Sequence, residues 1–270
     1  MPREKAYYWP DWLTKSLNED CLRLEKQFSK GQLALWRALN IYDDIIDGDN
    51  YQADLMSANH DFRKFLAVVY NSDLPPYFIK QADKIMTIWE KINRQEQQAS
   101  KLIIKNGAIK IPKNLTLTST ANSGYQKSLL LAILPIAGAI KLKQINRPRE
   151  VASLFNFFKY ALAAKQLADD ASDWLSDLKN GRLNPVNYLV LEAANYRKIK
   201  LNLKSRPEII YLLFADSAGP KTAKRILNLC RRAKKEASRL KIEDNAPIIN
   251  FLIRPLTLAA EKVLNFKNLL

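Results

Sequence analysis

The sequence predicts an all-α protein that folds as a single domain over residues 1–270. Apolar side chains recur mostly three and four residues apart, which is the spacing of one helix face. Only seven glycines and twelve prolines are present, which argues against a loop-rich β protein, and no alternating stretch makes a convincing strand. With 270 residues and 47% hydrophobic composition, the chain can bury one large core.

Helix-breaking residues divide this pattern in chain order. Breaks at Gly31, at residues 48–50 and at Pro75 and Pro76 separate the first four predicted helices, which span 13–28, 31–48, 52–70 and 76–105. A break from Gly107 to Pro112 precedes a predicted helix at 119–143. A long predicted helix, 148–180, ends at Gly181. The remaining predicted helices span 185–203, 206–216, 219–239 and 246–267.

Charge and the rare residue types narrow the function classes. The net charge of +16 and the pI of about 9.7 suit nucleic acid, an anionic membrane surface or anionic substrates. A basic, solvated surface explains the charge equally well, and no RNA-binding motif or zinc-finger spacing is present. With one histidine, His60, a zinc site or a Ser-His-Asp triad is not expected. Cys21 and Cys230 are expected to be free thiols.

The apolar segments indicate a cytoplasmic protein. The N-terminal stretch MPREKAYYWPDWL has no apolar core of signal-peptide length. The longest apolar run, LLLAILPIAGAI at 129–140, is too short to cross a bilayer and is expected to form a buried helix. Loose peripheral association with a membrane remains compatible with this pattern.

Two short segments concentrate the acidic residues of this basic chain. The segment LNIYDDIIDGDN contains Asp43, Asp44 and Asp47, of which Asp43 and Asp47 share a helix face. The segment QLADDASDWLSD contains Asp170 beside a row at spacings of four residues, formed by Asp169, Asp173 and Asp177. Like charges stacked in this way destabilise a helix unless something compensates them. A solvated acidic face would explain either segment alone, but together they hold eight of 27 acidic residues.

Magnesium would compensate these carboxylates. It takes oxygen ligands, keeps several waters and shares its remaining positions with substrate phosphates. Two acidic helix faces across a cavity would therefore bind a diphosphate through bridging magnesium ions.

The two segments resemble the metal-binding motifs of the class I isoprenoid synthases, which include terpene synthases, squalene and phytoene synthases and trans-prenyltransferases. DDIID resembles their first aspartate-rich motif, and Asp169, Asp173 and Asp177 take the spacing of the second. Gln166, Gly181 and Arg182 also fit the phytoene synthase pattern around that motif. The resemblance covers roughly residues 36–186. It implies an isoprenoid synthase-like helical bundle around a central cavity, three magnesium ions with bound diphosphate, and frequent homodimers.

The resemblance also implies which residues bind the diphosphate. Lys127 and Ser128, in YQKSL, resemble the lysine-threonine pair of prenyltransferases, in which the lysine holds the diphosphate. Arg182, near the second motif, and Arg37, two turns before Asp44, are further candidates. Each of these cations could instead be an ordinary surface residue.

The implied reaction is metal-assisted ionisation of an allylic prenyl diphosphate, with farnesyl or geranylgeranyl diphosphate as the expected substrate. The resulting carbocation needs a dry, apolar and aromatic cavity. The predicted cavity lining consists of Tyr42, Phe65, Tyr125, Gln166 and Trp174, with Trp36 and Phe158 as further candidates. Each of them could equally be plain core.

The branch of the superfamily stays open. Chain-elongating enzymes carry a GGKxRP-like segment before the first motif and an Arg-Arg pair after it, and this chain has neither. This chain departs from the terpene synthase pattern at two positions. Asp173 stands where that pattern has Ser or Thr, and Asp177 stands where it has Glu. A terpene synthase-like enzyme is the prediction, with head-to-head condensation as the close alternative. The non-enzyme alternative is a basic helical protein that binds membrane or nucleic acid; no nucleic-acid partner is expected for the enzyme.

Overall fold

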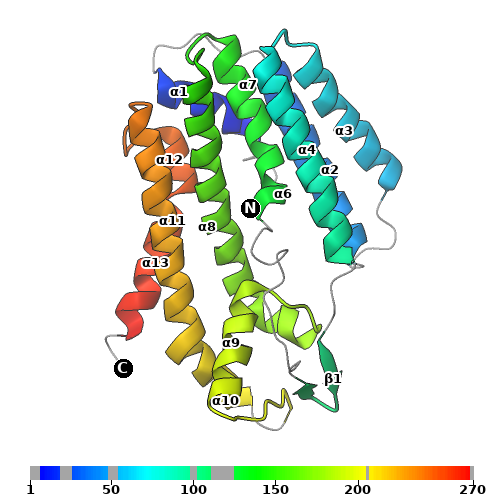
Figure 1. Ribbon diagram of the computed structural model, residues 1–270, viewed down its shortest axis with the longest axis vertical. Helices are drawn as coiled ribbons and strands as arrows, with labels where there is room; N and C mark the ends of the chain where they lie inside the picture. Colours follow the sequence, from blue (N-terminus) through cyan, green and yellow to red (C-terminus); the bar gives the residue numbers. More distant parts are fainter. Residues whose placement is uncertain are drawn as a thin grey trace. The chain divides into compact units, whose positions relative to one another are not determined.

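The structure, a computed structural model, describes residues 7–18, 26–47, 54–97, 102–110, 125–204 and 207–267. These residues are helical except for connections and one short hairpin (Figure 1), so the all-α prediction is confirmed. The elements are α1 Trp9–Leu17, α2 Lys26–Asp47, α3 Leu55–Tyr70, α4 Pro76–Gln97, β1 Ile103–Lys105, β2 Ala108–Lys110, α6 Tyr125–Ser128, η2 Leu129–Ala132, α7 Ile133–Lys141, α8 Pro148–Lys179, α9 Pro185–Tyr196, α10 Pro207–Leu213, η3 Phe214–Ala218, α11 Gly219–Arg239, α12 Pro247–Leu252 and α13 Arg254–Lys267.

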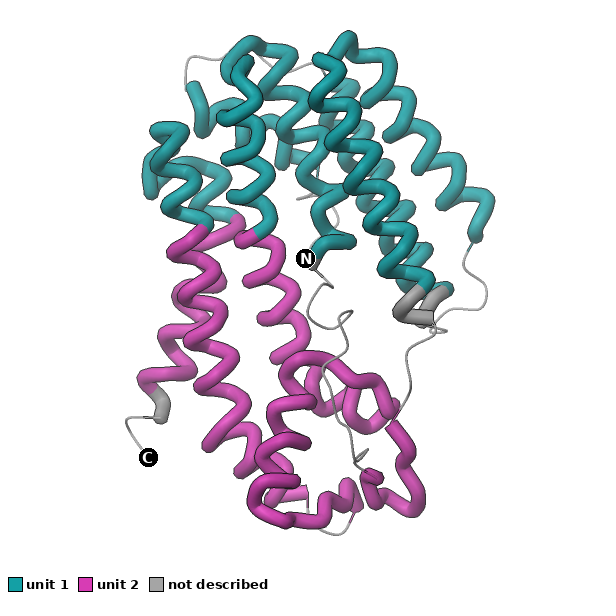
Figure 2. Tube along the Cα trace, in the orientation of Figure 1, with its two compact units in different colours: residues 1–97, 126–159, 233–251 teal, residues 98–125, 160–232, 252–270 magenta. Residues whose placement is uncertain are grey.

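The chain divides into two compact units, coloured separately in Figure 2. The first comprises Met1–Gln97, Gln126–Lys159 and Ala233–Phe251, and the second comprises Gln98–Tyr125, Tyr160–Arg232 and Leu252–Leu270. The chain passes from one unit to the other within α8 and again within α11. A single domain over 1–270 stays a prediction.

The core of the first unit forms where α2 packs on α3 and α7, and α1 packs on α7. Buried aromatic side chains fill it, with Trp9 against Phe158 and Phe78 against Phe155. In the second unit, α9 and α10 pack on η3. There, Trp174 of α8 stacks on Phe214 of η3 with ring centroids 4.5 Å apart.

The predicted break at Gly31 is wrong, because α2 continues through this residue. Gly31 is needed for close packing. A Cβ atom there would lie 2.9 Å from Leu134 Cδ1 and 3.1 Å from Val68 Cγ2, which is closer than packed carbon atoms normally approach. The predicted first helix, 13–28, is also wrong in its bounds, since α1 starts with Pro10 in its first turn and ends before an extended Asn18.

A strand pair lies in a region predicted to be helix and break. β1 and β2 pair antiparallel around Asn106 and Gly107, whose φ angles are +52° and +82°. Positive φ at both central residues is typical of the tight hairpin turn that Asn-Gly favours. The helix predicted to run to 203 ends at Tyr196, and Leu201 and Leu203 instead form backbone hydrogen bonds with Ile109 and Gly107.

Prolines explain two further differences from the predicted helices. The predicted helix 119–143 contains the 3-10 segment η2, followed by α7 with Pro135. Proline has no N–H to donate to the carbonyl four residues earlier, that of Leu131. The fully buried Gln32 of α2 donates its Nε2–H to this carbonyl at 3.0 Å. The predicted helix 246–267 is similarly interrupted between α12 and α13, just before Pro255.

Within the described ranges, no helix combines the length and the apolar character that crossing a membrane requires.

Candidate active site

The first acidic segment forms the C-terminal end of α2. The Asp43 side chain is 50% exposed and Asp44 is exposed. Asp47 is the last residue of the helix, and its side chain lies outside the described part of the chain. A helix C-terminus carries partial negative charge, which disfavours carboxylates, and the last turn of α2 contains no basic residue. A cation bound at this end would therefore stabilise the helix.

Lys127 supplies one such cation from a distant part of the sequence. It lies in the short helix α6, and its Nζ is 3.3 Å from Asp43 Oδ1 across 84 positions of sequence. The lysine side chain is 22% exposed. The structure thus brings the lysine of YQKSL into contact with the first aspartate segment. Its role with a diphosphate stays a prediction.

Aromatic side chains of α2, α3 and α4 pack together beside Asp43. Tyr42 contacts Phe62 and Trp89, and Phe62 in turn contacts the fully buried Phe65. The Tyr42 hydroxyl donates to Asn59 Oδ1 at 2.7 Å. Burial raises the pKa of Tyr42, against a smaller lowering by Arg63, so the phenol stays neutral. Tyr42 and Phe65 therefore belong to one aromatic cluster formed by α2, α3 and α4.

The other predicted residues of the first unit occupy different positions. Arg37 is exposed, and its seven-residue separation from Asp44 places both on one face of α2. Ser128 is half-buried at the junction of α6 and η2. Trp36 is half-buried and Phe158 is fully buried. The side chain of Tyr125 lies outside the described residues.

The second acidic segment lies on α8, where neighbouring polar groups hold its carboxylates. Asp169 pairs with Lys165, one turn earlier. Asp170 accepts a hydrogen bond from Gln166 Nε2 at 3.0 Å. Asp177 accepts one from Asn184 Nδ2 at 2.7 Å, while Asp173 is exposed. Gln166, predicted as cavity lining, therefore also positions an acidic side chain.

The sequence LKNGRLNPV ends α8, reverses the chain and starts α9. Gly181 has φ +72°, and a Cβ atom there would lie 2.9 Å from the backbone oxygen of Leu102. Asn184 then caps α9, since its Oδ1 accepts from the backbone N–H groups of Val186 and Asn187. Arg182, between them, is half-buried, and its backbone N–H donates to the carbonyl of Asp177 at 2.8 Å.

Sequence reasoning missed Asn184 and Lys165 as parts of this segment. Asn184 is 8% exposed, and its amide donates to both Asp177 Oδ2 and, at 3.4 Å, the backbone oxygen of Asp170. Asparagine directly before proline indicates a helix cap, but it does not reveal this contact with the preceding helix. Lys165 was detectable, because it lies four residues before Asp169.

Trp174, within the second acidic segment of α8, is buried in the second unit. Its ring is 6% exposed, lies parallel to Phe214 within 5° and meets Tyr211 edge-on. These contacts make it a core residue of the second unit. Its predicted role in lining a cavity stays a prediction.

The carboxylates fit magnesium by their chemistry. In the described ranges, no three or more His, Cys, Asp or Glu side chains converge into a ready-made metal cage. Magnesium does not need one, since it is commonly held by one or two carboxylates together with substrate phosphates and water. Asp43 and Asp44 provide accessible oxygen ligands of this kind. The first segment belongs to one unit and the second to the other, and their meeting around one substrate stays a prediction.

No protein-family model matches the chain, and no curated protein matches it. Its structure is similar to that of the geranylgeranyl pyrophosphate synthetase from the archaeon Geoglobus acetivorans, with a TM-score of 0.62. The match covers 96% of this chain and 84% of that chain, at 17% sequence identity. The likeness establishes the fold: the chain has the all-α isoprenoid synthase fold.

Proposed function

We propose that the protein is a magnesium-dependent enzyme that ionises an allylic prenyl diphosphate and releases diphosphate. The observation that carries the proposal is the contact between Lys127 and Asp43, 3.3 Å apart at the DDIID end of α2. This contact joins the lysine that we propose binds diphosphate to the aspartates that we propose bind metal, in a chain with the isoprenoid synthase fold. Neither the charge of the chain nor its fold alone would support this function as specifically.

The carboxylates of both segments would hold the magnesium ions, three by family resemblance. These carboxylates are Asp43, Asp44 and Asp47 on α2 and Asp169, Asp170, Asp173 and Asp177 on α8. Magnesium supplies Lewis-acid neutralisation of the departing diphosphate. Gln166 and Asn184 each fix the orientation of one carboxylate, that of Asp170 and of Asp177 respectively.

Lys127 is suited to exchange its partner when substrate arrives. Ion pairs that remain partly exposed contribute little stability, so the contact with the half-exposed Asp43 is easily replaced. A diphosphate group carries more negative charge than one carboxylate, and an ammonium group forms strong charge-assisted hydrogen bonds with its oxygens. Its departure would leave Asp43 available to a metal ion. Ser128, Arg182 and Arg37 are the further proposed contacts of the diphosphate.

We favour a terpene synthase-like reaction on one prenyl diphosphate, farnesyl or geranylgeranyl. Cavity lining by Tyr42, Phe65, Tyr125, Gln166 and Trp174 is part of this proposal. Chain elongation is the second candidate, because a similar solved structure is a geranylgeranyl pyrophosphate synthetase. Against elongation, the chain lacks the segments with which elongating enzymes bind isopentenyl diphosphate.

A product assay tests the proposal and separates these reactions. The protein is incubated with geranyl, farnesyl or geranylgeranyl diphosphate, with and without isopentenyl diphosphate and with and without magnesium. We expect magnesium-dependent diphosphate release from a single prenyl diphosphate. Longer diphosphates formed only with isopentenyl diphosphate would establish elongation, and a doubled carbon count would establish head-to-head condensation. Absence of release from every substrate would contradict the enzyme proposal.

A further inference from the structure

Helix α11 carries a row of exposed cations within the second unit. From Gly219 to Arg232 every charged residue is basic and exposed; these residues are Lys221, Lys224, Arg225, Arg231 and Arg232. At 3.6 residues per turn they occupy about one third of the helix circumference. The opposite face, with Ala223, Ile226 and Cys230, is buried. We call the five cations the α11 row.

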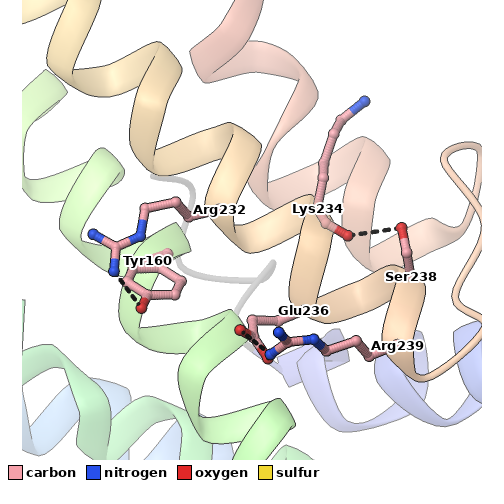
Figure 3. Close-up of polar contacts among 6 residues, drawn as sticks. All are labelled: Tyr160, Arg232, Lys234, Glu236, Ser238 and Arg239. Carbon is pink, nitrogen blue, oxygen red and sulfur yellow. Dashed lines mark hydrogen bonds and ion pairs between the residues drawn. The ribbon is translucent and has the colours of Figure 1, made fainter.

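The α11 row has little compensating negative charge. Lys221 lies 3.9 Å from Glu192, with both side chains at least half exposed, and such pairs are weak. Within the described part of the chain, Lys224, Arg225 and Arg231 form no ion pair. Arg232 is held by a neutral group: its guanidinium lies 4.1 Å from the ring centroid of Tyr160 and donates to the Tyr160 hydroxyl at 2.7 Å (Figure 3). These contacts fix the orientation of the Arg232 guanidinium and do not neutralise its positive charge.

Helix α4 shows that an exposed helix face can be solvated without a row of like charges. Its exposed face repeats the same residue spacing with Lys80, Asp83, Lys84, Glu90 and Lys91. In this spacing, Asp83 and Glu90 of α4 stand at the positions that Lys224 and Arg231 occupy on α11. A mixed face keeps a helix soluble without a strong local field, whereas five like charges repel one another and favour a polyanionic surface.

We infer that the α11 row is the surface by which the protein adsorbs to an anionic lipid membrane. Cations along one side of a helix can contact the headgroups of a planar bilayer together, and each adds to the attraction. The apolar side of α11 is buried in the protein, so adsorption is electrostatic and does not require insertion. The inference rests on the proposed function, because prenyl substrates and products partition into membranes.

Single-stranded nucleic acid fits the α11 row less well. Proteins that bind such strands combine cations with open aromatic faces on which bases stack. The ring that contacts the α11 row, that of Tyr160, has a face covered by Arg232. The observations therefore favour a charged lipid surface.

Vesicle sedimentation of the full-length protein tests the inference. Vesicles of phosphatidylcholine alone are compared with vesicles that also contain phosphatidylglycerol. The test variant combines Lys224→Gln, Arg225→Gln and Arg231→Gln. The matched control combines Lys80→Gln, Lys84→Gln and Lys91→Gln on α4, which removes the same net charge from exposed positions of a mixed face. Circular dichroism checks that both variants are folded.

We expect the wild type and the α4 variant to bind the anionic vesicles alike, and added salt to release both. Each cation contributes about a fivefold change in partitioning, so the α11 variant should bind about a hundredfold more weakly. Equal weakening in both variants would overturn the inference, since net charge would then be responsible. Tighter binding to single-stranded DNA, lost in the α11 variant alone, would overturn it in favour of nucleic acid.

Diphosphate release, measured in the same samples without vesicles, separates this inference from the proposed function. We expect the α11 variant to release diphosphate at the wild-type rate. Loss of vesicle binding with unchanged release supports the α11 row as a surface distinct from the chemistry. If the wild type binds vesicles through α11 but releases no diphosphate, the proposed function fails while the docking surface stands.

Discussion

At the scale of single residues, Asn184 joins the second acidic segment to the start of α9. Its Oδ1 caps the helix and its Nδ2 holds Asp177 at 2.7 Å. We predict that Asn184→Ala lowers the free energy of unfolding by about 2 to 4 kcal/mol, because it removes both a cap and a hydrogen bond to a charged group. Asn184→Ser keeps a capping oxygen and should recover about 1 kcal/mol of this loss. Urea denaturation measures both; an Asn184→Ala variant as stable as the wild type would contradict the assigned contacts.

Candidate residues were predictable where their spacing along one helix was informative, and unpredictable where the contact was long-range. The acidic row on α8 follows from four-residue spacing, and so does the pairing of Lys165 with Asp169. The contact between Lys127 and Asp43 crosses 84 positions, and only family resemblance suggested that they belong together. The donation by Asn184 to Asp177 depends on the chain reversal at Gly181, which spacing does not describe.

At the scale of elements, two properties of Gly181 bear on the end of α8: its backbone conformation and its contact with Leu102. The φ angle of +72° favours glycine but does not require it, because lysine adopts similar angles after α9 and α11, at Lys198 with +55° and Lys241 with +59°. Gly181 differs because the backbone oxygen of Leu102 would lie 2.9 Å from its Cβ. Backbone atoms cannot rotate away as a side chain can, so this contact excludes a larger residue.

We predict that Gly181→Ala destabilises the protein by about 2 to 3 kcal/mol, from left-handed backbone strain and the clash with Leu102 together. The matched control is Lys241→Gly, which changes a residue of similar φ and should stay within about 1 kcal/mol of the wild type. Thermal and urea unfolding measure both. If the Gly181→Ala variant were as stable as the Lys241→Gly variant, the prediction would be contradicted. The close contact with the Leu102 backbone oxygen would then be relieved at no cost in free energy of unfolding.

Some errors in the predicted element bounds arise because tertiary packing and pairing, and not the local sequence, decide where an element ends. Gly31 resembles a helix break in sequence, yet its missing Cβ lets α2 lie against Leu134 and Val68. The pair Asn106-Gly107 is typical of a hairpin turn, but this region was predicted as a helix end and a break, because its strands have only three residues each. Strands this short show no alternation, and their pairing with Leu201 and Leu203 is not visible locally.

At the scale of the whole molecule, the fold class was predictable because helical periodicity runs through nearly the whole chain. The order of the long helices follows from the same pattern, and the likeness to a solved isoprenoid synthase fold confirms the class. Periodicity does not determine whether two helix faces in separate units share one substrate. The central proposal therefore concerns function: we propose that the acidic segments of α2 and α8 act on one substrate.

The measurement that tests this claim most directly is magnesium-dependent diphosphate release by Asp43→Asn and Asp177→Asn, one from each acidic segment. The control is Asp73→Asn, an exposed residue with φ +50°, which asparagine tolerates. We predict that both test variants remain folded and lose at least about a hundredfold in release, since each loses a carboxylate that we propose binds magnesium. The control should match the wild type. Wild-type release by either test variant would contradict a shared role for the two segments.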